Sequence, residues 1–298
     1  MLNEFGGDWT IEKLECLSDY LLAYVKILRK KRYFRISYVD AFAGSGYISH
    51  EKSRDKVMPL FEEESGAVSK YLEGSTRIAL SIYPGFDQYI FIEKNKKMAK
   101  ALEKLREDYP EQSEKIQIIN SDANEYLTKW CAQKEFWQNN RAVVFLDPFG
   151  MEVKWQLLQS IAMTRAIDLW ILFPVFGVNR MLTKGKQPPE LWSDLLTNFF
   201  GTEEWKSSFY KTQTIPTLFG EEEATCKSSS INEIGLFFLD RLKTIFPHVI
   251  SEPLILCNSR NNPLFLLCFA ASNPTKGQVA VKIAHDIINK KTRETKER

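Results

Sequence analysis

Cysteine and histidine, the usual ligands of a structural zinc ion, are scarce in this 298-residue chain. It has five cysteines and three histidines, and no two cysteines have the spacing C-x-x-C. The sequence therefore predicts no metal site and no disulfide framework. We expect Cys257 and Cys268, which lie in apolar segments, to be buried and reduced.

Long apolar segments are also missing. No uninterrupted apolar run reaches the roughly 18 residues that a membrane-spanning helix needs. The first residues, MLNEFGGDWT, lack the charged-then-apolar layout of a signal peptide. We therefore expect a cytoplasmic protein without contact to a membrane.

A strong charge of either sign is absent too. The net charge of +2 argues neither for nor against a nucleic-acid partner, so local clusters matter more. Basic residues gather in 26–35, at the end of an expected helix, and in the tail 290–298. Each cluster is either a phosphate-binding surface or an ordinary solvated segment, and the tail is expected to be frayed.

What the chain does have is a regular alternation of strands and helices. Apolar strand patterns are followed by amphipathic helical patterns five times, and two final strands are joined by the turn-rich segment NSRNN. This order predicts an α/β fold, a Rossmann-like, doubly wound, seven-stranded sheet with a terminal antiparallel hairpin. The expected strands are 36–40, 88–92, 116–119, 142–146, 167–173, 249–257 and 263–270. The expected helices are 9–33, 75–83, 95–108, 123–137, 154–164, 188–200, 202–210, 230–246 and 276–290.

The whole chain, 1–298, is expected to form a single domain with three additions to this pattern. Residues 1–35 give an N-terminal helical extension, and 49–74 are polar and irregular, as an insertion would be. A second insertion, 174–229, follows the fifth strand and combines helical pieces with a polar loop at 211–229.

The most informative segment is YVDAFAGSGYI, in which the first expected strand ends at an acid and breaks into a glycine-rich turn. Gly44 and Gly46 flank Ser45 there. Glycines in such a turn let a ligand approach the backbone closely. The dinucleotide pattern G-x-G-x-x-G fails because its third glycine would fall on Ser49.

Four acids follow the ends of the first four strands. They are Asp40, Glu93, Asp122 and Asp147. A parallel sheet places all four at one edge, where Glu93 is suited to accept from ribose hydroxyls and Asp122 from an adenine amino group. Each acid alone has an ordinary alternative: Glu93 at a helix start, Asp122 as a helix cap, and Asp147-Pro148 as a turn opener.

This order of motifs resembles the class I S-adenosylmethionine-dependent methyltransferases over about 36–175. DAFAGSG is similar to the D-x-F-x-G-x-G of nucleic-acid methyltransferases, and DPFG to their D-P-P-[YF], although the second proline is missing and Gly150 follows. The resemblance implies S-adenosyl-L-methionine as cofactor and catalytic roles for Asp147, Pro148 and Phe149 on a target amino group. The cofactor contacts that it implies are Asp40, Phe42, Ala43, Gly44, Gly46, Glu93, Asp122 and Ala123.

Over about 8–200 the chain also resembles a narrower family, the three-Cys-motif partner proteins. The segments that carry this resemblance are YVDAFAGSG, GSTRIAL, FIEKN, LDPFG and LFPVFGVNRML. It implies a partner protein that has a three-cysteine motif and is similar to radical S-adenosylmethionine enzymes.

Three further residues are candidates for contact with a substrate. Phe176 and Trp155 would stack on a base, and Arg180 would hold a phosphate or close the pocket. Core packing is the alternative for the two aromatics, and a surface ion pair for Arg180. Three functions stay open: a methyltransferase acting on nucleic acid, an accessory module for the partner protein, and a methyltransferase acting on protein or a small molecule.

Overall fold

The structure is a computed structural model that describes residues 8–45, 74–217 and 220–297. Its centre is a sheet with the strand order β3-β2-β1-β4-β5-β10-β8, in which β9 also pairs with β10. The strands are β1 (Arg35–Asp40), β2 (Gln88–Ile92), β3 (Ile116–Ile119), β4 (Asn140–Leu146), β5 (Ile167–Phe173), β8 (His248–Val249), β9 (Leu254–Cys257) and β10 (Pro263–Ala271).

The first five strands are parallel, and β10 runs antiparallel to β5. This confirms the expected fold class, an α/β structure with a mostly parallel central sheet. The strand order reverses between β1 and β4, which is where open α/β sheets bind ligands.

The sheet has eight strands where seven were expected. The expected strand 249–257 is divided into β8 and β9, which flank an irregular segment containing Pro253. Proline has no N–H to donate to a neighbouring strand, so it interrupts the pairing. The terminal hairpin itself is present, as β9 and β10. Its Cys257 is only half-buried, against expectation, because β9 pairs with β10 alone; Cys268 on β10 is buried as expected.

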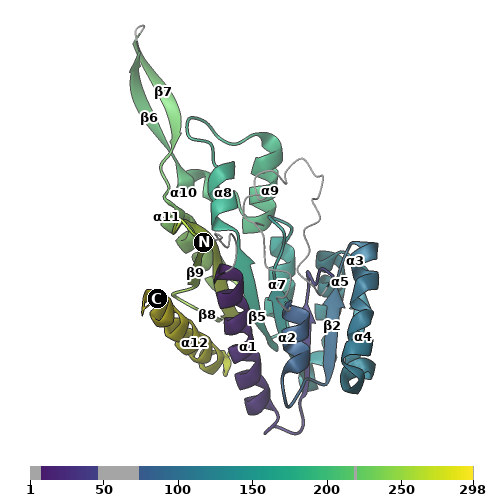
Figure 1. Cartoon of the computed structure of the whole chain (residues 1–298). Helices are drawn as coiled ribbons and strands as arrows, with labels where there is room; N and C mark the ends of the chain where they lie inside the picture. Colours follow the sequence, from purple (N-terminus) through teal and green to yellow (C-terminus); the bar gives the residue numbers. More distant parts are fainter. Residues whose placement is uncertain (1–7, 46–73, 218–219, 298) are drawn as a thin grey trace, which may run out of the picture.

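Helices cover both faces of the sheet (Figure 1). Side chains alternate along each strand, so on β1 Val39 enters one apolar core and Tyr38 the other. The first core is shared with α5, α7, α9 and α11, and the second with α1, α2 and α12. The helices are α1 (Asp8–Leu28), α2 (Ser75–Ser81), α3 (Lys96–Leu102), α4 (Lys104–Asp108), α5 (Ala123–Cys131), α6 (Phe136–Asn139), α7 (Trp155–Met163), α8 (Val175–Met181), α9 (Glu190–Phe200), α10 (Trp205–Phe209), α11 (Ile231–Lys243) and α12 (Gly277–Glu297), with a 3₁₀ turn at Pro110–Lys115.

Several helices differ in length from the sequence expectation. The first ends at Leu28 rather than at residue 33. Just after this end, the Arg29 side chain binds Asp87, with an Nη1–Oδ1 distance of 2.7 Å, and the Gly85 carbonyl. The expected helix 95–108 is two pieces, α3 and α4. The expected helix 123–137 is likewise α5 and α6.

The last helix, α12, continues to Glu297, although we expected a frayed tail after residue 290. Lys291 explains this difference: its ammonium lies 3.0 Å from Glu15 on α1 and 3.1 Å from Glu294. These ion pairs hold the last turns of α12 against α1.

The prediction of a polar loop at 211–229 is wrong. Residues in this region form a two-stranded ribbon of β6 (Tyr210–Thr217) and β7 (Gly220–Lys227), which projects from the rest of the chain (Figure 1). Its base is fixed by hydrogen bonds from Lys227 N to Lys184 O, 3.0 Å, and from Ser228 N to Phe209 O, 2.9 Å. Alternating threonines on β6 favour such a ribbon, since β-branched residues suit strands.

Most of the expected insertion 49–74 lies outside the described residues. Within the described part of the chain, no helix combines the length and apolar character needed to cross a membrane.

Candidate functional site

The four acids predicted from the strand ends lie at one edge of the sheet. Asp40 is the last residue of β1, and the other three follow β2, β3 and β4. Backbone hydrogen bonds join the loops: Ala43 N donates to Ile92 O at 3.0 Å, and Ala41 N to Phe145 O at 3.1 Å. The edge is therefore one connected surface at the point where the strand order reverses.

The glycine turn after β1 is open at Gly44. Its φ of +59° is a conformation that glycine adopts easily, and a Cβ built there would meet no atom within 4 Å. Ala43 is buried and Phe42 packs against the first core, so these two side chains attach the turn to the interior of the protein. Gly46 lies outside the described residues.

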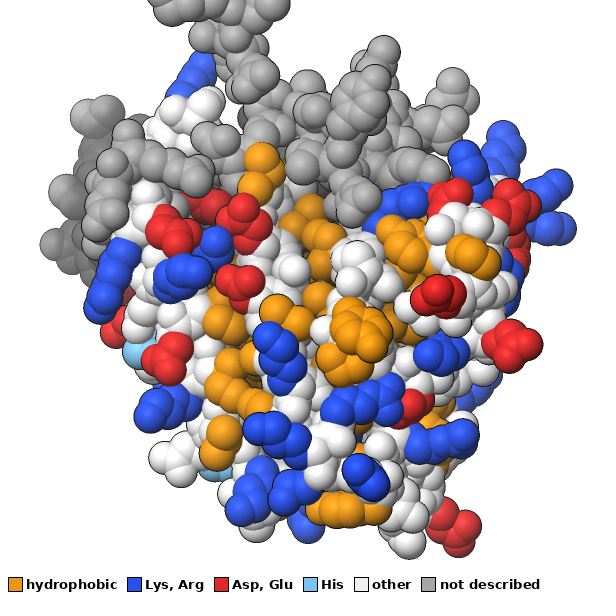
Figure 2. All heavy atoms as spheres, turned by 60° about the horizontal axis from the view of Figure 1, so that its bottom comes forward, with side chains coloured by type: hydrophobic (Ala, Val, Ile, Leu, Met, Phe, Trp, Pro, Cys, Tyr) orange, Lys and Arg blue, Asp and Glu red, His pale blue; other side chains and the backbone are white. Residues whose placement is uncertain are grey.

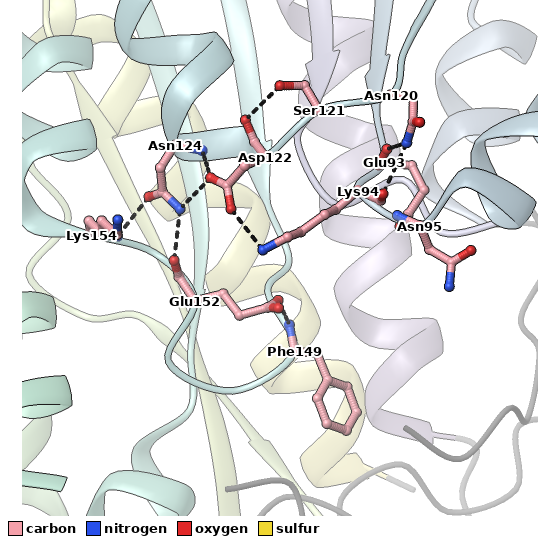
Figure 3. Close-up of polar contacts among 10 residues, drawn as sticks. All are labelled: Glu93, Lys94, Asn95, Asn120, Ser121, Asp122, Asn124, Phe149, Glu152 and Lys154. Carbon is pink, nitrogen blue, oxygen red and sulfur yellow. Dashed lines mark hydrogen bonds and ion pairs between the residues drawn. The ribbon is translucent and has the colours of Figure 1, made fainter. Parts of the chain in front are cut away.

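Glu93 connects this turn to the loop after β2. Its Oε2 accepts from Gly44 N at 2.9 Å, and its Oε1 accepts from Asn95 N at 2.6 Å. Asn120 supports the same loop by donating to the carbonyls of Glu93 and Lys94, at 2.8 and 3.0 Å (Figure 3). Each carboxylate oxygen of Glu93 keeps a second lone pair with which to accept from a ligand hydroxyl.

Asp122 caps α5. Its Oδ1 accepts from Asn124 N at 2.9 Å, and its Oδ2 lies 3.2 Å from the Lys94 ammonium (Figure 3). Burial opposes the charged form of Asp122, but its hydrogen bonds with Asn124 and Lys94 outweigh burial and lower its pKa. This geometry is that of the helix-cap alternative. Ala123, the first residue of α5, is buried.

Asn124 and Glu152 order the loop that follows β4, and sequence reasoning missed both roles. Asn124 donates to Glu152 O and accepts from Lys154 N, both at 2.9 Å. The Glu152 carboxylate accepts from Phe149 N at 3.2 Å (Figure 3). These bonds fix the DPFG segment against the loop after β3.

Asp40 is fully buried below the turn. Its Oδ2 accepts from the Ser75 hydroxyl, and its Oδ1 faces Phe42 N at 3.4 Å. Burial raises the pKa of Asp40 to about 7, with the Ser75 hydrogen bond opposing that rise. Gly74 holds the N-cap position of α2, and the side chain of Ser75, the first residue of that helix, donates to the acid.

Asp147 forms an ion pair with a residue that sequence reasoning missed. The Lys13 ammonium, on α1, lies 2.5 Å from Asp147 Oδ2, and the two side chains are 7% and 25% exposed. Next to Asp147, Pro148 is buried and Phe149 is 40% exposed. Gly150 has a φ of +77°, which turns the chain away after the exposed ring.

The substrate-side candidates separate into two groups. Phe176 and Arg180 both lie on α8, directly after β5, and the guanidinium is 5.8 Å from the ring centroid. Trp155 is 5% exposed and belongs to the first core. Its ring lies against Gly201, and the Arg241 guanidinium is 4.8 Å from the ring centroid. Core packing is therefore the role that the structure gives Trp155.

The basic cluster 26–35 lies at the opposite end of the sheet, because it precedes β1 while the acids follow the strands. Lys26, Lys30, Lys31, Arg32 and Arg35 are exposed there. Figure 2, with the lower end of Figure 1 turned forward, shows many Lys and Arg side chains with apolar groups between them. β1, with six residues, separates this cluster from Asp40 by roughly 20 Å.

No group of three or more His, Cys, Asp or Glu residues in 8–45, 74–217 and 220–297 is arranged to hold a metal ion.

No protein-family model and no curated protein matches this chain. Among solved structures, it is similar to protein LPL1258 from Legionella pneumophila, with 16% identity over 80% of this chain and 93% of that one and a TM-score of 0.41. YhhF of Escherichia coli, a candidate methyltransferase, has 12% identity over 71% of this chain and 86% of that one, at 0.28. YcgJ of Bacillus subtilis has 11% identity over 84% and 95%, at 0.25. These values are low, so the site itself is the evidence for a function.

Proposed function

We propose that this protein is an S-adenosyl-L-methionine-dependent methyltransferase that acts on an amino group in nucleic acid. One observation carries the proposal: hydrogen bonds and an ion pair connect four segments at one edge of the sheet. These segments are the open glycine turn, the loops at Glu93 and Asp122, and the DPFG segment. We also propose that the chain is a three-Cys-motif partner protein and works with the three-cysteine-motif protein. The sequence segments named above support that assignment.

The residues present fit the cofactor. The space above Gly44 is open, as required where a ligand lies against the backbone. Glu93 would accept from the ribose hydroxyls, and the loop at Asp122 and Ala123 would border the adenine. When bound, the cofactor supplies an electrophilic methyl group on a sulfonium.

The acceptor side is built from the DPFG segment. The Asp147 carboxylate and the Pro148 carbonyl would accept hydrogens from the target amine and orient its lone pair. Exposed Phe149 would stack on the base that carries the amine, with Phe176 and Arg180 on the neighbouring α8. Positioning of the amine is the main contribution of these residues.

Cofactor binding is tested at Gly44. Gly44→Asn should greatly reduce binding of S-adenosylmethionine and S-adenosylhomocysteine, because asparagine tolerates a positive φ while its side chain fills the open space. Gly185→Ala is the matched control, since a Cβ there also meets nothing within 4 Å and φ is not positive. Calorimetry on folded protein decides: no binding of either compound to the wild type would reject the cofactor.

Catalysis is tested at Asp147. Asp147→Asn keeps the shape and removes the charge, so methyl transfer to the nucleic-acid substrate should fall at least about 100-fold. Affinity for the cofactor should stay within a few-fold. Labelled cofactor offered with RNA, DNA and protein, with and without the partner protein, measures both the rate and the substrate class. Turnover that survives the change would return Asp147 to its role as a turn opener.

One observation favours a second function, an accessory module that binds cofactor without transferring its methyl group. DPFG lacks the second proline of D-P-P-[YF]. Its Phe149 is followed by Gly150, which has a positive φ. Tight cofactor binding with no transfer to any acceptor class would favour the module.

A further inference from the structure

We propose that Lys13 is the positioning residue for Asp147, and that the first turns of α1 thereby form one wall of the acceptor site. This inference rests on the proposed function for the role of Asp147. It assigns a task to α1, an element outside the segment 36–175 that resembles methyltransferases.

Lys13 and Asp147 form a largely buried ion pair between α1 and the end of β4. Lys13 reaches from α1 to a carboxylate 134 positions away in the sequence, and its ammonium lies 2.5 Å from Asp147 Oδ2. The lysine side chain is only 7% exposed. An ammonium so deeply buried is costly unless it is paired, so this contact differs from an exposed ion pair, which contributes little.

An aromatic neighbour also holds the Lys13 ammonium in place. The Trp9 ring, one turn earlier on α1, has its centroid 5.2 Å from Lys13 Nζ, within the range of a cation–π contact. Trp9 in turn packs on Phe265 of β10, with 5.0 Å between ring centroids. The lysine is therefore fixed from the side of the aromatic ring as well as by the carboxylate.

Lys13 also lies where two acids come together. Asp40 ends β1 and Asp147 follows the adjacent strand β4, and the charge of Asp147 disfavours ionisation of the buried Asp40. The Lys13 ammonium pairs with Asp147 and favours the charged form of Asp40. Lys13 is therefore placed to reduce the repulsion between these two carboxylates.

Lys13 has a defined task in the reaction. It holds Oδ2 of Asp147, so that Oδ1 is presented to the substrate amine. Asp147 then serves as a fixed hydrogen-bond acceptor. Because Lys13 itself acts through Asp147, its loss should change the rate more than substrate or cofactor affinity.

The test compares Lys13→Met with Lys13→Arg. Lys13→Met should lower kcat at least about 10-fold at pH 7, with KM and cofactor affinity within a few-fold. Lys13→Arg should restore most of the rate, because it returns the charge. The control is Lys243→Met, which removes an exposed ion pair on α11, that of Lys243 with Asp240. Its kcat should equal that of the wild type.

A second measurement decides the matter without catalysis. In protein labelled at aspartate carboxyl carbons, the Asp147 signal is assigned by its loss in Asp147→Asn and compared by NMR between the wild type and Lys13→Met at pH 8. Its chemical shift should change in Lys13→Met, because the ion pair is lost. An equal chemical shift in both proteins would overturn the role of Lys13 even in an active enzyme. A changed chemical shift in a protein that binds no cofactor and transfers no methyl group would reject the proposed function and keep the Lys13–Asp147 contact.

Discussion

At the scale of single residues, the acids at this edge of the sheet are held in different ways. Glu93 accepts from Gly44 N in the turn after β1, and Asp122 from Asn124 N in the helix that it caps, whereas Asp147 faces a buried lysine. Asp40 is the most buried of the four and accepts from the hydroxyl of Ser75. Burial raises the pKa of Asp40, whereas hydrogen bonds lower the pKa of Asp122.

Asp40 should make the stability of the protein fall as pH rises from about 4 to about 7. Its pKa is raised from 3.8 to about 7 by burial, so the folded chain binds this proton more tightly than the unfolded chain does. The resulting stabilisation is complete below pH 4 and is lost as pH rises through 7, with a range of about 4 kcal/mol. Asp40→Asn should remove this dependence.

Urea unfolding of the wild type and Asp40→Asn at pH 5, 6, 7 and 8 measures the difference in free energy of unfolding. Asp240→Asn, which changes an exposed acid on α11, is the control and should follow the wild type. If the curves for Asp40→Asn and the wild type stay parallel over this range, the Asp40 carboxyl is not the titrating group.

The sequence predicted the acids of the site but not the residues that hold them. An acid after an apolar strand is a local pattern, and strand order then brings such acids together. Lys13 and Ser75 reach their partners from helices that are distant in the sequence, and nothing in their own segments marks that contact. The orientation of a side chain depends on how helices pack, which periodicity does not specify.

At the scale of elements, α9 ends against Trp155. Gly201 terminates the helix with a φ of +67°, and a Cβ there would lie 2.0 Å from Trp155 Cδ1. Gly201→Ala should therefore destabilise the protein by at least about 2 kcal/mol, from overpacking and backbone strain together. Cofactor affinity of the folded protein should hardly change.

Urea unfolding and calorimetry on the same preparation test this expectation, with Gly185→Ala as the control. A variant that keeps its stability but loses substrate or cofactor binding would place Trp155 in the site rather than in the core.

The bounds of an element were predicted well where its sequence is mostly apolar and poorly where it is polar. The strands β2, β3 and β5 have the expected bounds, since each is apolar apart from a single polar residue. The ribbon β6–β7 was missed because it projects from the domain and so carries no core-facing alternation; its acids, Glu221 to Glu223, suggested a loop.

At the scale of the whole molecule, basic charge and candidate active site lie at opposite ends of the sheet. If the cluster 26–35 binds phosphates of the substrate, binding should weaken steeply with salt, and the triple variant Lys30→Glu, Lys31→Glu, Arg32→Glu should reduce the slope of log K against log salt by about 3. The paired control Lys206→Glu, Lys243→Glu reverses two lysines elsewhere and should leave the slope nearly unchanged. A flat salt response of the wild type would leave the cluster as a solvated surface.

The contact between α12 and α1 has a consequence for synthesis on the ribosome. Strands β1 to β4, with the turn and acids that would hold the cofactor, are made early, and Lys13 is made before any of them. The support that Lys291 gives to Glu15 comes 276 positions later, after every strand of the sheet has been translated. A nascent chain can therefore assemble the cofactor side first, while the wall that carries Lys13 gains its full support only when α12 emerges.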